Sequence, residues 1–282
     1  MPNVSRRSFL LASTAAAGAA LLDLTAGRAA EGSQDFGGWP VGIQSYTLRK
    51  FNTAEALRHV EGLGLHYIEF FGAHFSPDAS DEQIAQMKKT LTNAGIKLNA
   101  HGVNGFGKDH EANRKLFEFA RKAGFRNLTA NPAPDAFDSL DKLVDEYNIR
   151  IAIHNHGPGA LYDGLETVTQ RLEGRHKLIG ACIDTGHVLR SGGDPVAWTR
   201  ALGNRVFALH LKDVAEKQDR THDVVLGEGH LDMVGLFRAL KEIKFPADGS
   251  LSVEYESNPD NPVEDVRQCL VVTREAIAKA TG

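Results

Sequence analysis

Short apolar runs alternate with longer amphipathic stretches along most of the chain. Eight runs rich in Val, Ile and Leu have the length of buried β-strands and lie at residues 41–47, 66–70, 97–101, 127–130, 150–156, 179–184, 206–211 and 251–255. Stretches with helical periodicity follow them at residues 53–63, 80–93, 111–123, 137–147, 165–172, from 194–195 onward, 233–243 and 262–280. Helix-start signals support this pattern, such as the capping box that Ser80 and Gln83 form before the second helix.

Strand–helix units that repeat over about 240 residues predict a single (β/α)8 barrel, the TIM barrel, for residues 31–282. The competing architecture is a doubly wound open sheet. A glycine-rich phosphate turn would be expected after its first strand, and the sequence after residue 47 has none. The pattern therefore favours the barrel.

Composition agrees with one large globular domain and limits its partners. The chain has 282 residues, of which 42% are hydrophobic and 24% charged. Its net charge of −4 and interspersed charges argue against nucleic-acid binding, which usually needs a basic face. Cys182 and Cys269 both fall in predicted core elements, so we expect two buried free thiols rather than a disulfide.

The N-terminus differs from the rest of the chain. Arg6 and Arg7 form a twin-arginine pattern, an Ala/Leu-rich stretch follows at residues 11–22, and small residues at 26–30 offer a cleavage site. This pattern predicts a twin-arginine signal peptide over residues 1–30 and a periplasmic or secreted protein. The apolar part is shorter than the about 20 residues of a membrane span, so we expect no stable membrane insertion after its removal. A disordered leader or a retained N-terminal anchor is the alternative.

Polar residues gather where the predicted strands end, and the carboxyl ends of barrel strands are where catalytic groups lie. The set comprises Glu69, His101, Asn131, His154, His156, Asp184, His187, His210, Lys212, Glu254 and Glu256. His154, Asp184, His210 and Glu254 stand at comparable heights on four successive strands. Two imidazoles and two carboxylates suit one divalent ion, such as Mn, Zn, Co, Fe or Mg.

Simpler explanations exist for individual residues in this set. An inward histidine is often a core group with its hydrogen bonds satisfied, and Asp184 followed by His187 also fits a turn-capping carboxylate and a surface histidine. Four more of the twelve histidines are expected at the surface: His59, His74, His110 and His176.

The sixth- to eighth-strand motifs resemble the xylose-isomerase-like TIM-barrel superfamily. They are the segments 183–187 (IDTGH), 210–213 (HLKD) and 226–230 (LGEGH), followed by Glu254. That superfamily includes sugar isomerases and epimerases, inosose dehydratases and AP endonucleases of the same fold. The resemblance implies that Asp184, His210 and Glu254 are metal ligands. The fifth-strand ligand of the epimerases is usually glutamate, and His154 at this position departs from that pattern.

The endonuclease branch is a weaker match. It resembles this chain at His101, Asp184, His187, His210 and His222. Its trinuclear cluster also uses a histidine after the fourth strand, where this chain has Asn131, and a fifth-strand glutamate, where it has His154. With the acidic net charge, these departures disfavour a role in DNA repair.

The resemblance implies a divalent-metal-dependent sugar isomerase or epimerase that works through a metal-stabilised enediolate. Elimination from a keto-sugar or keto-glycoside by a lyase or dehydratase shares the same first step and is the alternative. No basic phosphate cradle follows the last two strands, so we expect a non-phosphorylated small carbohydrate. A non-catalytic carbohydrate-binding barrel is a third hypothesis, and the sequence leaves a homo-oligomer open.

Roles follow for the remaining candidates. Glu254 doubles as ligand and base, with His156 or Glu69 as its acid–base partner. Lys212 and His187 bind substrate oxygens or stabilise the enediolate, although an ion pair of Lys212 with Asp213 or Glu256 is the alternative. Further polar contacts are expected from Glu69 and His101 on the opposite wall, and stacking on the sugar from Tyr46.

Overall fold

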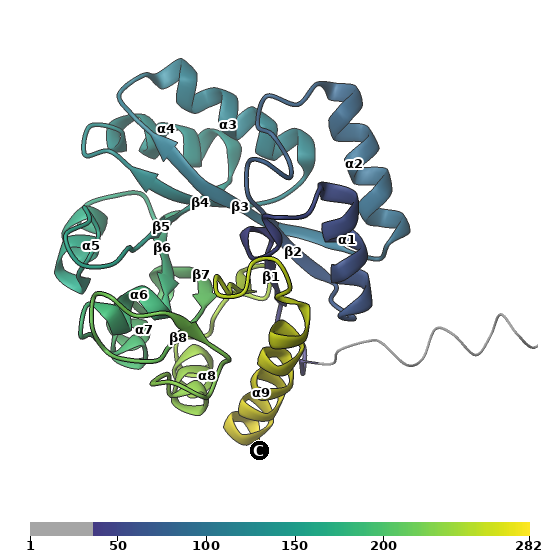
Figure 1. The fold of residues 1–282 in the computed structure, drawn as a ribbon. Helices are drawn as coiled ribbons and strands as arrows, with labels where there is room; N and C mark the ends of the chain where they lie inside the picture. Colours follow the sequence, from purple (N-terminus) through teal and green to yellow (C-terminus); the bar gives the residue numbers. More distant parts are fainter. Residues whose placement is uncertain (1–35) are drawn as a thin grey trace, which may run out of the picture. The chain divides into compact units, whose positions relative to one another are not determined.

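The computed structural model describes residues 36–282, which form a closed parallel barrel with helices around it (Figure 1). The strand order is β1-β10-β7-β6-β5-β4-β3-β2, as predicted for a single (β/α)8 barrel. The barrel strands are β1 (Val41–Gln44), β2 (Tyr67–Phe70), β3 (Lys97–Phe106), β4 (Asn127–Pro132), β5 (Arg150–His154), β6 (Ile179–Asp184), β7 (Val206–Leu211) and β10 (Ser250–Val253). The predicted signal peptide lies outside the described residues.

The helices connect successive strands and cover the outside of the barrel. They are α1 (Thr53–Gly62), α2 (Asp81–Asn93), α3 (His110–Ala123), α4 (Phe137–Tyr147), α5 (Leu165–Leu172), α6 (Thr185–Arg190), α7 (Pro195–Leu202), α8 (Met233–Glu242) and α9 (Val263–Thr281). Side-chain caps fix several starts: Asn52 and Ser80 form capping boxes at α1 and α2, and Asp109 caps α3. Within the described residues, no helix is long and apolar enough to cross a membrane.

Several boundaries differ from the prediction. The first strand ends at Gln44, and residues Ser45–Leu48 form a 3-10 turn in which the Gln44 side chain accepts a hydrogen bond from Tyr46 N. The fifth strand ends at His154, so His156 lies in a loop and not on the strand. The loop predicted after the seventh strand contains a small antiparallel hairpin of β8 (Asp213–Val214) and β9 (Asp223–Val224).

The burial of the two cysteines and of His74 tests two further predictions. Cys182 and Cys269 are both buried free thiols, as predicted. His74, expected at the surface, is buried instead, and its Nε2 lies 2.9 Å from the carbonyl oxygen of Phe51. The hydrogen bond explains how an imidazole is accommodated there.

Close packing inside the barrel depends on glycine where one backbone passes against another chain segment. A methyl group on Gly180, in β6, would overlap the carbonyl oxygen of Arg205 and the ring of Phe207. Gly105, in β3, has open space at the same position. The two glycines therefore form a matched pair.

We predict that Gly180→Ala lowers the free energy of unfolding by about 1–3 kcal/mol or more, because the neighbouring backbone has to move. Gly105→Ala should change it by less than about 1 kcal/mol. Urea unfolding followed by circular dichroism measures both, and equal stability of the two variants would contradict the packing described.

Candidate metal centre

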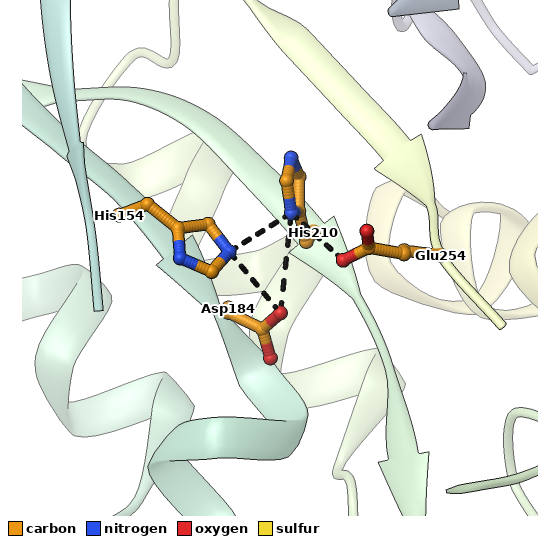
Figure 2. Close-up of side chains that lie close together, drawn as sticks. All are labelled: His154, Asp184, His210 and Glu254. Carbon is orange, nitrogen blue, oxygen red and sulfur yellow. Dashed lines mark hydrogen bonds and ion pairs between the residues drawn. The ribbon is translucent and has the colours of Figure 1, made fainter. Parts of the chain in front are cut away.

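Four neighbouring strands of the barrel each supply one side chain to a buried cluster (Figure 2). His154 ends β5, Asp184 ends β6, His210 lies in β7, and Glu254 directly follows β10. Strand pairing sets Asp184 beside His210. One ligand atom from each residue lies within 4.8 Å of the other three, and all four residues are buried. We call these four residues the metal set.

The atoms of the metal set converge on one another. His154 Nε2 lies 3.0 Å from His210 Nδ1 and 3.4 Å from Asp184 Oδ2, and His210 Nδ1 lies 3.0 Å from Glu254 Oε2. Asp184 Oδ2 is buried without a well-aligned hydrogen-bond donor among the described residues. Two nitrogens and two carboxylate oxygens in this arrangement fit a divalent ion such as Zn, Mn, Co or Fe.

The two carboxylate oxygens of Asp184 have different surroundings. Oδ1 accepts a hydrogen bond of 2.8 Å from the backbone N–H of His187 and so caps α6, which leaves Oδ2 facing the metal set. Asn155 fixes the same backbone, because its amide donates to Asp184 O and accepts from Asp184 N. The turn-capping explanation for Asp184 therefore holds for Oδ1, and Oδ2 is left available as a metal ligand, which stays a prediction.

Glu69 lies behind the metal set and not in the pocket wall where we expected an acid. It is fully buried, its Oε1 lies 3.1 Å from His210 Nε2, and its Oε2 accepts hydrogen bonds from Ser250 and Ser252. Burial alone would raise the pKa of Glu69, but the charge of His210 and these hydrogen bonds outweigh it and lower the pKa. A carboxylate on Nε2 leaves Nδ1 of His210 for a metal.

His101 was predicted as a substrate contact, and its position contradicts that prediction. The side chain is fully buried among the rings of Phe119 and Phe125, and its Nε2 lies 2.9 Å from the carbonyl oxygen of Phe75. It faces the helices and is a core histidine with one hydrogen bond satisfied.

Lys212 is the cation next to the metal set. Its Nζ lies 3.0 Å from Glu254 Oε2 and 3.4 Å from Asp184 Oδ2, and it also pairs with Glu256. Burial would lower the pKa of Lys212, but the three carboxylates outweigh it and hold the pKa well above its usual value. Of the two ion pairs given as alternatives for Lys212, the one with Glu256 is formed and the one with Asp213 is not. The carboxylate of Asp213 instead accepts hydrogen bonds from the backbone N–H groups of Gly227, Gly229, His230 and Leu231.

The ionisation of the metal set largely matches what a metal needs. Burial, partly opposed by Asp184, lowers the pKa of His154 to about 4, so its imidazole is neutral near pH 7. Burial would raise the pKa of Glu254, but Lys212 and His210 lower it far below its usual value. His210 is the exception: burial would lower its pKa, but neighbouring Cys182, Glu69 and Glu254 raise it. A metal on His210 Nδ1 therefore displaces a proton.

The metal set faces a cavity of about 450 Å³, which we call the main cavity. Its lining includes the predicted residues Tyr46, His154, His156, His187, Lys212 and Glu254. The Tyr46 ring stands edge-on to Phe71 with 5.4 Å between centroids and is 37% exposed. The lining thus combines aromatic rings with charged side chains. The catalytic and substrate-binding roles predicted for these residues stay predictions.

Three further lining residues escaped the sequence reasoning. Arg190 lies on α6, and its Nη1 is 3.2 Å from His187 Nδ1. A six-residue helix directly after a strand has too little periodicity to be seen, and the only signal was Asp184 as its cap. Gln44 lines the main cavity and was missed because it lies within a predicted strand. Asp223 lines a second cavity next to the main one and was missed because it lies in a predicted loop.

We predict that metal binding depends on the metal set and not on histidine content. Asp184→Asn and His154→Gln should each lose a transition metal that the unaltered protein retains after loading and dialysis, because each removes or weakens one ligand. Metal analysis with circular dichroism measures this. The exposed His66→Ala variant is the control, and loss of metal there would contradict the assignment.

Glu69→Gln should weaken metal affinity by about 10–100-fold while the four ligands remain, because a neutral amide no longer orients and polarises His210. Competition with a fluorescent chelator gives the affinity. Glu61→Gln, an exposed carboxylate on α1, should leave it unchanged. Equal affinity of the Glu69→Gln variant and the unaltered protein would show that this carboxylate does not tune the site.

Solved structures with the same architecture extend over most of the described chain. An uncharacterised protein from Parabacteroides distasonis is 32% identical, with a TM-score of 0.66 over 84% of this chain and 99% of that one. A xylose isomerase domain protein from Alicyclobacillus acidocaldarius has a TM-score of 0.72 at 18% identity, over 86% and 99%. The zinc-containing IOLI protein has a TM-score of 0.68 at 20% identity, over 86% and 99%.

Relatives with named activities match a shorter stretch. The inosose dehydratase of Clostridium tetani is 31% identical over 145 residues, 45% of this chain and 48% of that protein. The inosose dehydratase of Clostridium beijerinckii is 29% identical over 170 residues, 52% and 53%. The chain thus spans about half the length of these relatives. Residues 57–274 match the family described as the xylose isomerase-like TIM barrel, and the chain belongs to that family.

Proposed function

We propose that the protein is a metal-dependent lyase that eliminates an oxygen substituent from a keto-sugar or a related cyclic polyhydroxy ketone. The observation that carries the proposal is the metal set at the floor of the main cavity, with the neutral imidazoles of His156 and His187 and the ammonium group of Lys212 in the same lining. A cavity lined by both charged side chains and aromatic rings suits a polyol whose ring has polar edges and an apolar face.

The relatives favour elimination over the isomerase or epimerase activity that we first predicted. The two sequence relatives with a named reaction are inosose dehydratases, and a dehydratase removes an oxygen as water. The identity of residue 154 also favours elimination. Epimerisation needs acid–base groups of similar strength on both faces of one carbon, and His154 replaces the glutamate expected on one side. Isomerisation stays the second hypothesis and is tested below.

An ion held by the metal set would supply a Lewis acid that acidifies the carbon beside the substrate carbonyl. Side chains of the protein would supply the hydrogen-bond donor and the base that the reaction also needs. Lys212, protonated and buried, can donate a hydrogen bond to a substrate oxygen as negative charge develops on it. Glu254 is held by His210 and Lys212 at 3.0 Å each, which leaves it little freedom to act as a base.

His156 is the base that we assign. It lines the main cavity without belonging to the metal set, and its ring lies 4.5 Å from that of His154 and 5.5 Å from that of His187. Burial, with help from the neighbouring His187, lowers the pKa of His156, so the ring is neutral and able to accept a proton near pH 7. His187 and Tyr46 are left to position the substrate.

Product mass distinguishes the hypotheses. We predict that the metal-loaded protein converts a cyclic polyhydroxy ketone to a product lighter by one water, or by one alcohol if the departing oxygen is substituted. An isomer of unchanged mass would instead support isomerisation or epimerisation. Binding without conversion would support the non-catalytic barrel.

A variant of His156 tests the role of this residue as the base. His156→Gln should lower kcat by about 100-fold or more, since a positioned base contributes about 10²–10⁴-fold. The exposed His66→Ala variant should keep full activity. Full activity of His156→Gln would remove that residue from the mechanism without affecting the lyase assignment.

Export is a separate proposal that rests on the twin-arginine pattern of residues 1–30. If it operates, the substrate is a neutral sugar derivative outside the cytoplasm. Fusion of these residues to a reporter that matures only after twin-arginine transport, with Arg6 and Arg7 replaced by Lys as the control, tests it directly.

A further inference from the structure

A second cavity of about 250 Å³, which we call the side cavity, adjoins the main cavity. The two share four lining residues: His187, Arg190, Lys212 and Glu256. The rest of the side cavity comes from Gly186 and from the polar residues Thr221, His222, Asp223 and Ser257. Asp223 in β9 and the two residues before it thus bring a polar surface against the charged side chains of the main cavity.

The metal set belongs to only one of the two cavities. His154 and Glu254 line the main cavity and are absent from the lining of the side cavity. A ketone that reaches the metal set therefore lies in the main cavity, with its ring against Tyr46 and Phe71. The side cavity remains for a substituent that extends from that ring past Lys212 and Glu256. Loss of water alone would not need this space.

Asp223 is fixed at the boundary between the cavities. Its Oδ2 accepts a hydrogen bond of 2.9 Å from the backbone N–H of Glu256, and its carbonyl oxygen accepts one of 2.8 Å from Ser257 Oγ. Pairing of β9 with β8 holds its backbone. Asp223 is thus a carboxyl group held on the side of the boundary where a substituent would depart.

The surroundings of Asp223 favour its protonated form. Burial raises its pKa to about 6, the carboxylates of Glu256 and Asp184 add to the increase, and Lys212 with the Glu256 backbone opposes it. The charged or titratable groups around Asp223 and the side cavity are Lys212 after β7, Glu256 after β10, Asp184 at the end of β6, His187 and Arg190 on α6, and the adjacent His222.

We propose that the side cavity holds the leaving group of the elimination, that this group is a second sugar or a similarly hydroxylated alcohol, and that Asp223 donates a proton to its departing oxygen. The inference rests on the proposed lyase function. The hydroxylated nature of the leaving group follows from the polar side chains of Thr221, His222 and Ser257, which offer hydrogen bonds and little apolar surface.

The step balances without a further reactant. The base takes the proton from the carbon beside the carbonyl, and the C–H electron pair becomes a C=C bond. The C–O bond on the next carbon breaks, its electron pair goes to oxygen, and that oxygen takes the proton of Asp223 and leaves as an alcohol. Solvent returns the proton to Asp223 and removes the one on the base. The substrate is accordingly a glycoside with its ketone two carbons from the glycosidic carbon.

Leaving groups of different basicity test the role of Asp223. A keto-disaccharide releases a sugar alcohol that needs a proton, whereas the matching keto-glycoside of nitrophenol releases an anion that does not. Asp223→Asn should lower kcat for the keto-disaccharide by about 100-fold and for the nitrophenyl substrate much less. Thr221→Ala, in the same cavity, should raise KM for the keto-disaccharide, because it removes a hydrogen bond to the leaving sugar, but it should not lower kcat selectively for that substrate. Equal losses with Asp223→Asn would overturn the acid role.

The pH profile adds a second readout. With the keto-disaccharide, kcat of the unaltered protein should fall as pH rises through about 6, because the protonated carboxyl is the active form. The nitrophenyl substrate should lack this decrease. If the metal-loaded protein cleaves neither substrate, the lyase function fails together with this inference. If it cleaves both with the same pH dependence, only the role of Asp223 fails.

Binding tests the side cavity without turnover. A disaccharide without the ketone cannot react, and calorimetry should show it to bind more tightly than the single sugar. Thr221→Trp, which fills the side cavity, should remove that difference, whereas Thr90→Trp on the surface of α2 should keep it. Equal affinity of the unaltered protein for both sugars would overturn the assignment of the side cavity.

Discussion

The arrangement of the site depends on one buried imidazole between two carboxylates. His210 contacts Glu69 through Nε2 at 3.1 Å and Glu254 through Nδ1 at 3.0 Å, and neither His210 nor Glu69 is accessible to solvent. Uncompensated charges at such depth would be strongly destabilising, so each must be paired. The pairing fixes the height of His210, and His210 in turn positions His154 and Asp184 around the same point.

Lys212 supplies a positive charge beside these carboxylates and lies between the metal set and the space for a substrate. It neutralises Asp184, Glu254 and Glu256, and it lies at the boundary of both cavities. A metal in the set would take over part of that neutralisation, which would free the ammonium group for a substrate oxygen. The charges that pair with one another in the protein would then also act on the substrate that we propose.

Strand alternation was sufficient to predict the barrel and the convergence of the metal set, because pairing of β6 with β7 is regular over its last three pairs, which end with Asp184 beside His210. It failed at His101, where irregular pairing turns the side chain toward the helices, and it did not predict that Glu69 lies behind the metal set, below the cavity wall. Pairing of β2 with β3 shifts between Ile68 and Glu69, and pairing of β3 with β4 shifts between His101 and Asn104. Such bulges have no signature in the hydrophobic pattern. The β8–β9 hairpin, which carries Asp223, was missed because two-residue strands are set by tertiary contacts.

The central claim is that the metal set binds one divalent ion at the floor of the main cavity. Anomalous X-ray diffraction from crystals of the manganese- or zinc-loaded protein tests it most directly. We expect one strong peak enclosed by His154 Nε2, Asp184 Oδ2, His210 Nδ1 and Glu254 Oε2. A peak elsewhere, or none at this position while Lys212 keeps its ion pairs with Asp184 and Glu254, would contradict the account.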